Sequence, residues 1–249
     1  MVVRPAKTNV SVHQTKEERK MLVKKSLLTV FAAALVVGLC APALMAAAQD
    51  GDKVELKIEV PKPQFTGTPR NIKLGRPDPG MGKPRKAFFV PAGTELVSTG
   101  KPVTSSDPAP IIGELSYVTD GDKEAADGSF VELGLDTQWV QIDLEAVYSI
   151  EALVVWHYHS EARAYYDVIV QTADDPDFLT NVQTLYNNDY DNSSKLGVGR
   201  DYEYVETNEG RLIDGKSTKA RYIRLYSKGN TTNEMNHYIE VEVFGRPAS

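Results

Sequence analysis

A tight acidic turn, Asp120-Gly121-Asp122, is the stretch of the sequence whose spacing best fits metal chemistry. Calcium prefers six to eight oxygen ligands at about 2.3 to 2.6 Å, and carboxylates and backbone carbonyls on a tight loop supply them well. Two aspartates separated by one glycine therefore predict a calcium site in this loop. The alternative is a simple polar turn, because Asp and Gly are common turn residues.

An aromatic and basic stretch, WHYHSEAR from Trp156 to Arg163, is the second candidate for chemistry. Sugar recognition usually combines an aromatic face against the apolar side of the ring with donors from Arg and other polar side chains to the hydroxyl groups. We expect this stretch to leave the end of a strand and to form a ligand site in the following loop. The predicted ligand-binding residues are Trp156, His157, Tyr158, His159, Arg163 and Tyr165.

Other roles stay open for several of these side chains. Trp156 lies in an apolar run, as Trp139 does, which favours core packing. His157 and His159 could be solvated or structural histidines. They also share one face of a strand, so they could hold a transition metal with His237 as a third ligand.

The sequence carries no signature of catalysis. It has no G-x-S-x-G, no H-E-x-x-H, no phosphate loop and no G-x-G-x-x-G. Asp189, Asp191 and Ser193 alternate as in a helix-loop-helix calcium loop, but Ser194 and Arg200 stand where that motif requires Gly and Glu. We interpret this run as a polar turn, and we expect a binding protein rather than an enzyme.

Short strands are expected to position these residues. From Leu96 to Gly245, short apolar runs alternate with turn-forming clusters, and no helical period extends beyond a few turns. This profile is typical of an antiparallel sandwich. The predicted strands are residues 139–144, 149–158, 166–172, 182–187, 201–207, 220–227 and 238–244.

Six sequence blocks in this region resemble the discoidin family, also called coagulation factor five/eight type C domains, and are similar to family 32 carbohydrate-binding modules. The blocks are GKPVTSS from Gly100, VTDGD from Val118, WVQIDL from Trp139, YDV from Tyr166, ARYIRLY from Ala220 and EVEVFG from Glu240. The resemblance implies an all-β fold, a galactose-binding-like jelly-roll β-sandwich. It also implies that loops at one end bind carbohydrate, or in some members phospholipid or protein.

The same resemblance implies a ligand set for the calcium site. In members that resemble fucose-binding lectins, the loop aspartates, a following hydroxyl and the first glutamate of the last strand supply the oxygens. In this sequence the matching side chains are those of Asp120, Asp122, Ser129 and Glu240, with backbone carbonyls near Tyr117 and Ile239.

Residues 1–48 are expected to be a leader and signal peptide. An apolar run from Leu27 to Leu39 is followed by Ala46-Ala47-Ala48, a small-residue site for signal peptidase. The run is shorter than the ~20 residues that a membrane span requires. We predict that translation begins at Met21 and that the mature protein is secreted or periplasmic in a bacterium. The only cysteine, Cys40, lies in this segment, so no disulfide is expected in the mature chain.

The charge balance argues against nucleic acid as a partner. Seven of the 28 Lys and Arg residues and two of the 34 Asp and Glu residues lie in the first 48 residues. The remaining chain therefore carries 21 basic and 32 acidic side chains. Such an acidic protein repels polyanions and anionic membrane surfaces.

A proline-rich extended arm or linker is predicted for residues 49–95, before the sandwich domain at residues 96–247. Ten of the 14 prolines lie between Pro61 and Pro110, and the alternation from Val54 to Val60 predicts one strand. The leading hypothesis is a non-catalytic carbohydrate-binding module with structural calcium, whose partner is a carbohydrate or cell-surface glycan. The alternative is a structural or interaction subunit that docks a protein partner through the arm.

Overall fold

The computed structural model describes residues 52–65, 69 and 71–248. The leader and signal peptide predicted for residues 1–48 lie outside this range. Among the described residues, no helix is long and apolar enough to cross a membrane. The predicted domain boundaries at residues 48 and 95 stay predictions.

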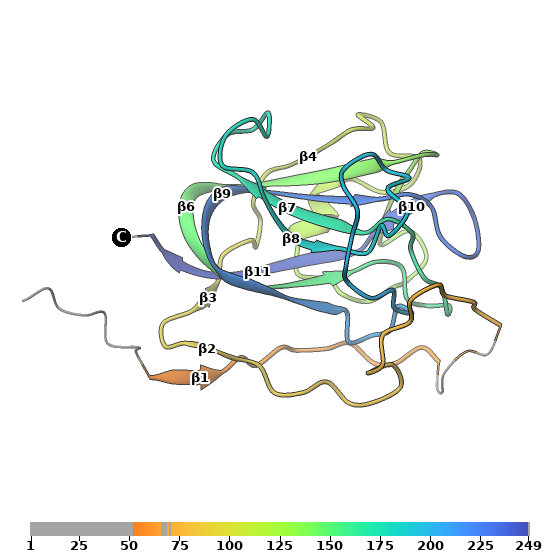
Figure 1. Cartoon of the computed structure of the whole chain (residues 1–249), viewed down its shortest axis with the longest axis horizontal. Coiled ribbons are helices and arrows are strands. Elements are labelled where there is room, and N and C mark those ends of the chain that lie inside the picture. The colour runs from red at the N-terminus through yellow and green to blue at the C-terminus, as the bar shows by residue number, and fades with distance from the viewer. Residues whose placement is uncertain (1–51, 66–68, 70, 249) are drawn as a thin grey trace, which may run out of the picture. The chain divides into compact units, whose positions relative to one another are not determined.

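The regular secondary structure of the described chain is almost entirely antiparallel β-strand, arranged in two layers around a core (Figure 1). The strands are β1 (Lys53–Glu55), β2 (Phe89–Pro91), β3 (Glu95–Leu96), β4 (Val103–Ser105), β5 (Val131–Leu133), β6 (Gln138–Trp156), β7 (Ile169–Ala173), β8 (Gln183–Asn187), β9 (Arg211–Ser227), β10 (Asn236–Tyr238) and β11 (Glu240–Pro247). One short 3-10 helix, η1, spans Leu115–Thr119. The all-β sandwich expected from the sequence is confirmed.

A seven-stranded sheet with the order β3-β11-β6-β9-β7-β8 forms most of the fold, and β4 pairs with β6 outside this path. Two further strand pairs, β10-β5 and β1-β2, are separate two-stranded sheets. Every pairing between these strands is antiparallel. This topology brings strands from both ends of the sequence into one sandwich.

The long strands β6 and β9 pair along nearly their whole length and bend together. Their register shifts between Asp143 and Tyr148 and again between Ile150 and Ala152. Glu145, inside the first shift, has a left-handed backbone with φ of 64°. Such irregularities increase bending and twist, so the two strands can pass from one layer of the sandwich to the other. Figure 1 shows them turning over at one end of the sandwich.

The core follows the alternation that the sequence shows in β6 and β9. Ile223 and Leu225 are 0% and 1% exposed, while Arg224 between them is half-buried. Trp156 is fully buried, in agreement with the packing alternative, whereas Trp139 is half-buried. The fully buried side chains of largest volume are Trp156, Tyr238, Leu133, Ile142, Leu144, Ile150, Leu153, Ile169, Ile223, Leu225, Ile239 and His157.

Several of the strand predictions differ from the structure. The strands predicted for 139–144 and 149–158 are one continuous strand, β6, and the strand predicted for 238–244 spans the break between β10 and β11. Residues 201–207 form no strand of the sheets, and Glu203 makes only an isolated β-bridge to Pro77. The strand predicted for 220–227 is much longer, because β9 already begins at Arg211. The sequence Asp214-Gly215-Lys216 resembles a turn, but here it lies within the bulged part of the ladder opposite Ile150.

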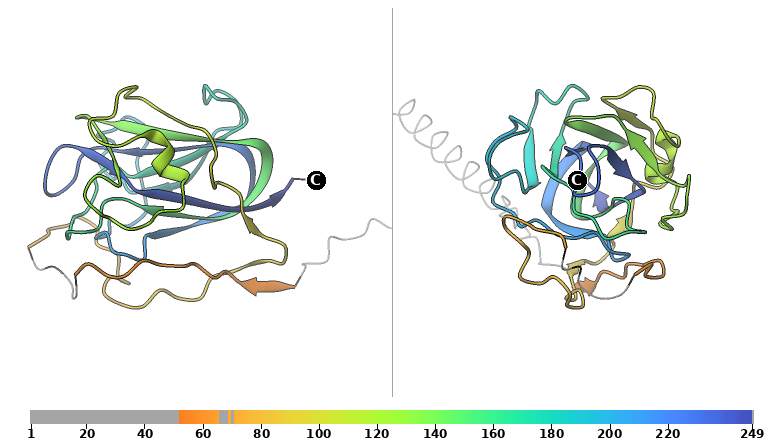
Figure 2. Two further views of the ribbon diagram at one scale, coloured as in Figure 1. Left: turned by 180° about the vertical axis from the view of Figure 1, so that it is seen from behind. Right: turned by 90° about the vertical axis from the view of Figure 1, so that its right-hand side faces the viewer.

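The proline-rich arm lies along the sandwich (Figure 2). Its first strand, β1, covers only the start of the alternation predicted from Val54 to Val60 and pairs with β2. The half-buried side chains of Leu56, Ile58 and Phe88 pack against a buried cluster that contains Trp156 and Phe244. The arm therefore shares a hydrophobic core with the sandwich.

Gly215 gives a direct test of the bulged ladder. An added Cβ would lie 2.4 Å from the carbonyl oxygen of Ile150, so the Gly215→Ala change must displace backbone. We expect a loss of about 1–3 kcal/mol in the free energy of unfolding, measured by chemical denaturation. The control is Gly134→Ala, whose Cβ would meet only side-chain atoms, a carboxylate oxygen of Asp107 at 3.3 Å and Gln138 Nε2 at 3.9 Å. Equal losses in the two variants would contradict this account of the bulge.

Candidate functional site

The six residues predicted to bind a ligand lie near one another, but mostly in the interior. Trp156, His157 and His159 are 0% exposed, Tyr165 is 2% exposed and Arg163 is 5% exposed. Only Tyr158 is half-buried. A sugar at the surface cannot reach buried side chains. The predicted ligand-binding role of these residues stays a prediction, and we do not place them in the pocket described below.

Their contacts are those of a polar core. The Nε1 atom of Trp156 donates to the carbonyl oxygen of Asn208 at 2.9 Å, and His157 Nδ1 lies 2.7 Å from Glu206 Oε1. His159 Nε2 lies 3.0 Å from the carbonyl oxygen of Lys123. These contacts favour the structural alternative for both histidines.

The predicted calcium loop forms a polar turn joined to the last strand. The Asp122 amide donates to Asp120 Oδ1 at 2.8 Å, and the Gly121 amide donates to Glu240 Oε2 at 3.0 Å. Asp120, Asp122 and Glu240 do not converge to within 4.8 Å as a group. The Ser129 amide donates to the carbonyl oxygen of Ala126 at 3.1 Å.

Glu240 nevertheless lies in surroundings that suit a cation. It is 1% exposed, and no Lys or Arg of the described chain forms an ion pair with it. The pKa of Glu240 is raised to about 8, chiefly by burial and also by the nearby carboxylates of Asp120 and Glu242, although the hydrogen bond from the Gly121 amide opposes the shift. A cation between Glu240 and Asp120 would offset both the desolvation and the repulsion. The residues of this loop thus fit a cation by charge, although their side chains are not gathered.

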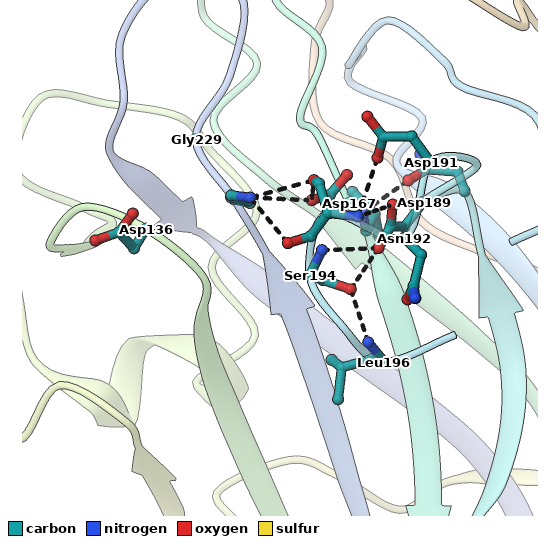
Figure 3. Close-up of polar contacts among 12 residues, drawn as sticks. Asp136, Asp167, Asp189, Asp191, Asn192, Ser194, Leu196 and Gly229 are labelled. Atoms are coloured by element: carbon teal, nitrogen blue, oxygen red, sulfur yellow. Dashed lines mark hydrogen bonds and ion pairs between the residues drawn. The ribbon is translucent and has the colours of Figure 1, made fainter. Parts of the chain in front are cut away.

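A different acidic cluster is gathered at the opposite side of the sheet. The carboxylates of Asp167, Asp189 and Asp191 each offer an oxygen within 4.8 Å of the others (Figure 3). Among the described residues, this is the only group of three or more His, Cys, Asp or Glu side chains that converges closely enough to hold a metal ion. The histidine set with His237 considered from the sequence is not such a group.

Backbone donors already occupy much of this cluster. The amides of Ser193 and Ser194 each donate to Asp189 at 3.0 Å, and the Ser193 amide also donates to Asp191 at 3.0 Å. Burial opposes ionisation of Asp189, but hydrogen bonds from the Ser194 hydroxyl and from the amides of Ser194 and Ser193 together outweigh it and lower its pKa. The pKa of Asp167 is raised, chiefly by burial. The polar turn predicted for this run is present, but no pattern in the sequence indicated that Asp167 would join it.

A pocket of about 290 Å³ lies beside the acidic cluster. Its lining residues are Lys73, Gly75, Tyr166, Asp167, Asn188, Tyr190, Asp191, Ser193, Glu203 and Lys228. Tyr166 and Tyr190 are 40% and 48% exposed, so both rings offer aromatic surface to a ligand. The Lys228 ammonium donates to the carbonyl oxygen of Ser193 at 3.1 Å and lies 4.0 Å from Asp167.

Strand register explains why these distant residues meet. Ile169 pairs with Asn187 on one side and with Tyr226 on the other, so the loops before β7, after β8 and after β9 leave the sheet together. The predicted strand 166–172 includes Tyr166, whereas β7 begins only at Ile169, so Tyr166 lies in the preceding loop. Tyr190 lies in the run that we interpreted as a polar turn. A tyrosine within the otherwise polar run NNDYDNSS was the one signal in the sequence that marked this pocket.

Glu240 should make the stability of the protein depend on pH. The folded protein binds this proton more tightly than the unfolded chain, in which a glutamate titrates near 4.5. The contribution is therefore fully present below about pH 4.5 and is lost as the pH rises toward 8, by up to about 1.4 kcal/mol per pH unit. In chelator, denaturant titrations at several pH values should show this loss, and Glu240→Gln should remove it. An unchanged pH profile in Glu240→Gln would contradict the assignment.

Comparison with known proteins finds one family model that matches the central part of the chain. Residues 117–225 match the F5/F8 type C family model described as NedA-like, galactose-binding domain. No curated protein sequence matches the chain.

Three solved structures illustrate the similarity to known modules. The CBM32 of AlyQ in complex with 4,5-unsaturated mannuronic acid is 20% identical over 60% of this chain and 95% of its own, with a TM-score of 0.44. A fucose binding module of Streptococcus pneumoniae is 18% identical over 63% of this chain and 99% of its own, with a TM-score of 0.44. A family 89 glycoside hydrolase from Clostridium perfringens is 17% identical over 61% of this chain but only 15% of its own, with a TM-score of 0.47.

The assignment depends on the family match, since all three TM-scores are below 0.5. The matched residues run from η1 into β9 and include the β6–β9 pair. The resemblance drawn from the sequence blocks is confirmed: residues 117–225 match a galactose-binding domain model of the F5/8 type C, or discoidin, family.

Proposed function

We propose that this protein is a non-catalytic carbohydrate-binding module that holds its ligand in the pocket beside Tyr166 and Tyr190. One observation carries the proposal: at the loop end of a galactose-binding domain, two half-exposed tyrosines lie beside carboxylates and an ammonium group in one pocket. Its volume of about 290 Å³ is close to the lower end of the range for small-molecule sites. A single sugar residue is the size of ligand that it suits.

The chemistry of the lining suits a ring that carries hydroxyl groups. The face of a tyrosine ring packs against the apolar C–H side of a sugar, and the tyrosine hydroxyl can hydrogen-bond to the hydroxyl groups at the edge of the sugar ring. Asp191 is exposed and accepts hydrogen bonds, whereas Lys228 donates them. Charged partners make stronger hydrogen bonds than neutral ones, so each contact would help to orient the ring.

The proposal includes the expected location and cofactor. Secretion rests on the predicted signal peptide in residues 1–48, and the partner would be a carbohydrate or cell-surface glycan. The ligands of the structural calcium would be Asp120, Asp122, Ser129 and Glu240. The physical reason is that the Glu240 carboxylate is buried without a basic ion-pair partner among the described residues. Docking of a protein partner through the arm is less favoured, because Leu56, Ile58 and Phe88 already pack against the sandwich.

Removing either pocket tyrosine should weaken saccharide binding. We expect Tyr166→Ala and Tyr190→Ala each to raise the dissociation constant about tenfold, since an aromatic contact contributes about 0.5–1.5 kcal/mol beyond the area that it buries. A glycan array would identify the best-retained saccharide, and calorimetry with that saccharide and with galactose would measure affinity. The matched control is Val198→Ala, a 67% exposed residue of the same loop outside the pocket. Unchanged affinity in both tyrosine variants would exclude this pocket.

Calcium should stabilise the fold through the loop at Asp120. A ligand at a hundred times its dissociation constant adds about 2.7 kcal/mol to the stability of the folded state. Thermal melts should therefore show Asp120→Ala less stable than the unchanged protein in calcium, and equally stable in chelator. Asp191→Ala is the comparison variant for the other acidic cluster. If only Asp191→Ala lost the calcium response, the ion would belong to the cluster of Asp167, Asp189 and Asp191.

A further inference from the structure

We infer that the proline-rich arm is part of the ligand site, and that Lys73 and Gly75 form a wall that determines which saccharides enter. The inference rests on the proposed function, since it concerns the same pocket. The arm lies outside residues 117–225, the part of the chain that the family model matches. This wall is therefore a feature of the present chain rather than one carried by the matched domain.

Backbone hydrogen bonds fix the arm to the segment that follows β8. The Arg76 amide donates to Glu203 Oε2 at 2.6 Å, and the Glu203 amide donates to the carbonyl oxygen of Arg76 at 2.9 Å. The Asp78 amide donates to the carbonyl oxygen of Glu203 at 2.8 Å. Glu203 is 5% exposed, so water competes little for these bonds. The arm is thereby held in register beside the pocket.

An ion pair and an aromatic contact extend this attachment. Arg211 Nη1 lies 2.6 Å from Asp78 Oδ2, at the start of β9. The Arg76 guanidinium lies 5.4 Å from the centre of the Tyr202 ring, and its Nη2 donates to the carbonyl oxygen of Arg200 at 2.9 Å. Arg76 and Asp78, which follow Gly75, are thus each anchored by more than one contact, so the position of the wall does not depend on a single interaction.

Gly75 sets the distance between the arm and Tyr190. A Cβ added at Gly75 would lie 2.8 Å from the Tyr190 hydroxyl oxygen and 3.0 Å from Cζ of the ring. Only glycine lets the backbone approach the ring this closely. Tyr190 is 48% exposed, so a larger residue at position 75 would push the ring toward solvent rather than disrupt the core. Gly75 therefore controls where one aromatic surface of the pocket lies.

Lys73 supplies a charged donor on the arm side of the pocket. It is exposed, and no hydrogen bond or ion pair joins its side chain to the described residues. The other lysine of the pocket, Lys228, already donates to Ser193. A saccharide between the arm and the loop would meet a free ammonium group at Lys73 and an acceptor at Asp191. Ligands whose oxygens reach both groups should be preferred.

The test compares arm variants on a glycan array and by calorimetry with the best-retained saccharide. We expect Lys73→Ala to weaken binding about three- to tenfold. We expect Gly75→Ala to change the order of preferred saccharides, because Tyr190 moves. Lys86→Ala, an exposed arm lysine outside the pocket, is the matched control and should bind as the unchanged protein does. Thermal melts would verify that each variant is folded, and Lys73→Ala removes only an exposed side chain.

The outcomes separate this inference from the proposed function. If the unchanged protein binds a saccharide and Tyr190→Ala weakens it, but both arm variants keep the same affinity and array profile, the arm is not part of the site. If the unchanged protein binds no saccharide, the proposed function fails, and the inference fails with it. Loss of affinity in Lys73→Ala with none in Lys86→Ala supports the wall.

Discussion

The bent pairing of β6 with β9 is the constraint on which the rest of the structure depends. These strands pair from Gln138 with Ser227 to Val155 with Arg211, through two register shifts. Because both strands bend, both ends of β6 emerge at the loop end of the sandwich, where β7 and β8 also deliver their loops. The pairings of β7 with β8 and with β9 then bring the loops of the pocket together, and the contacts of Arg76 and Asp78 add the arm. Small changes in the bulge would therefore affect the site from a distance.

Beneath the loops, a buried polar chain includes Tyr165, one of the residues predicted to bind a ligand. His237 Nε2 lies 2.9 Å from Glu132 Oε2, and His237 Nδ1 lies 2.9 Å from the Tyr165 hydroxyl. Burial, helped by Arg163 and His157, lowers the pKa of His237 to about 3. The ring is therefore neutral at pH 7, so Nε2 donates to Glu132 and Nδ1 accepts from Tyr165. These are hydrogen bonds rather than ion pairs, and they tie the loop before β7 to β5 and β10.

Strand alternation predicted the fold well, because burial on one face of a strand is a local property. The strand prediction failed at 201–207, where burial does not alternate and the partners are not a strand. Glu206 meets His157 and Glu203 meets the backbone of Arg76, across 49 and 127 positions. The same limit applies to the site. Aromatic and basic residues close together in sequence became core, whereas the pocket combines Lys73 with residues more than 90 positions away.

The acidic cluster shows how the fold uses charge to shape this pocket. Both carboxylate oxygens of Asp189 accept amides of the loop that follows Tyr190, and the Ser194 hydroxyl also donates to it. Asp167 adds a contact with the Ser193 hydroxyl, and Lys228 approaches the same group. A cation at this position would have to compete with donors already in place. The cluster therefore acts first on the loop, closing it into a tight turn that leaves the Tyr190 ring facing solvent beside Gly75.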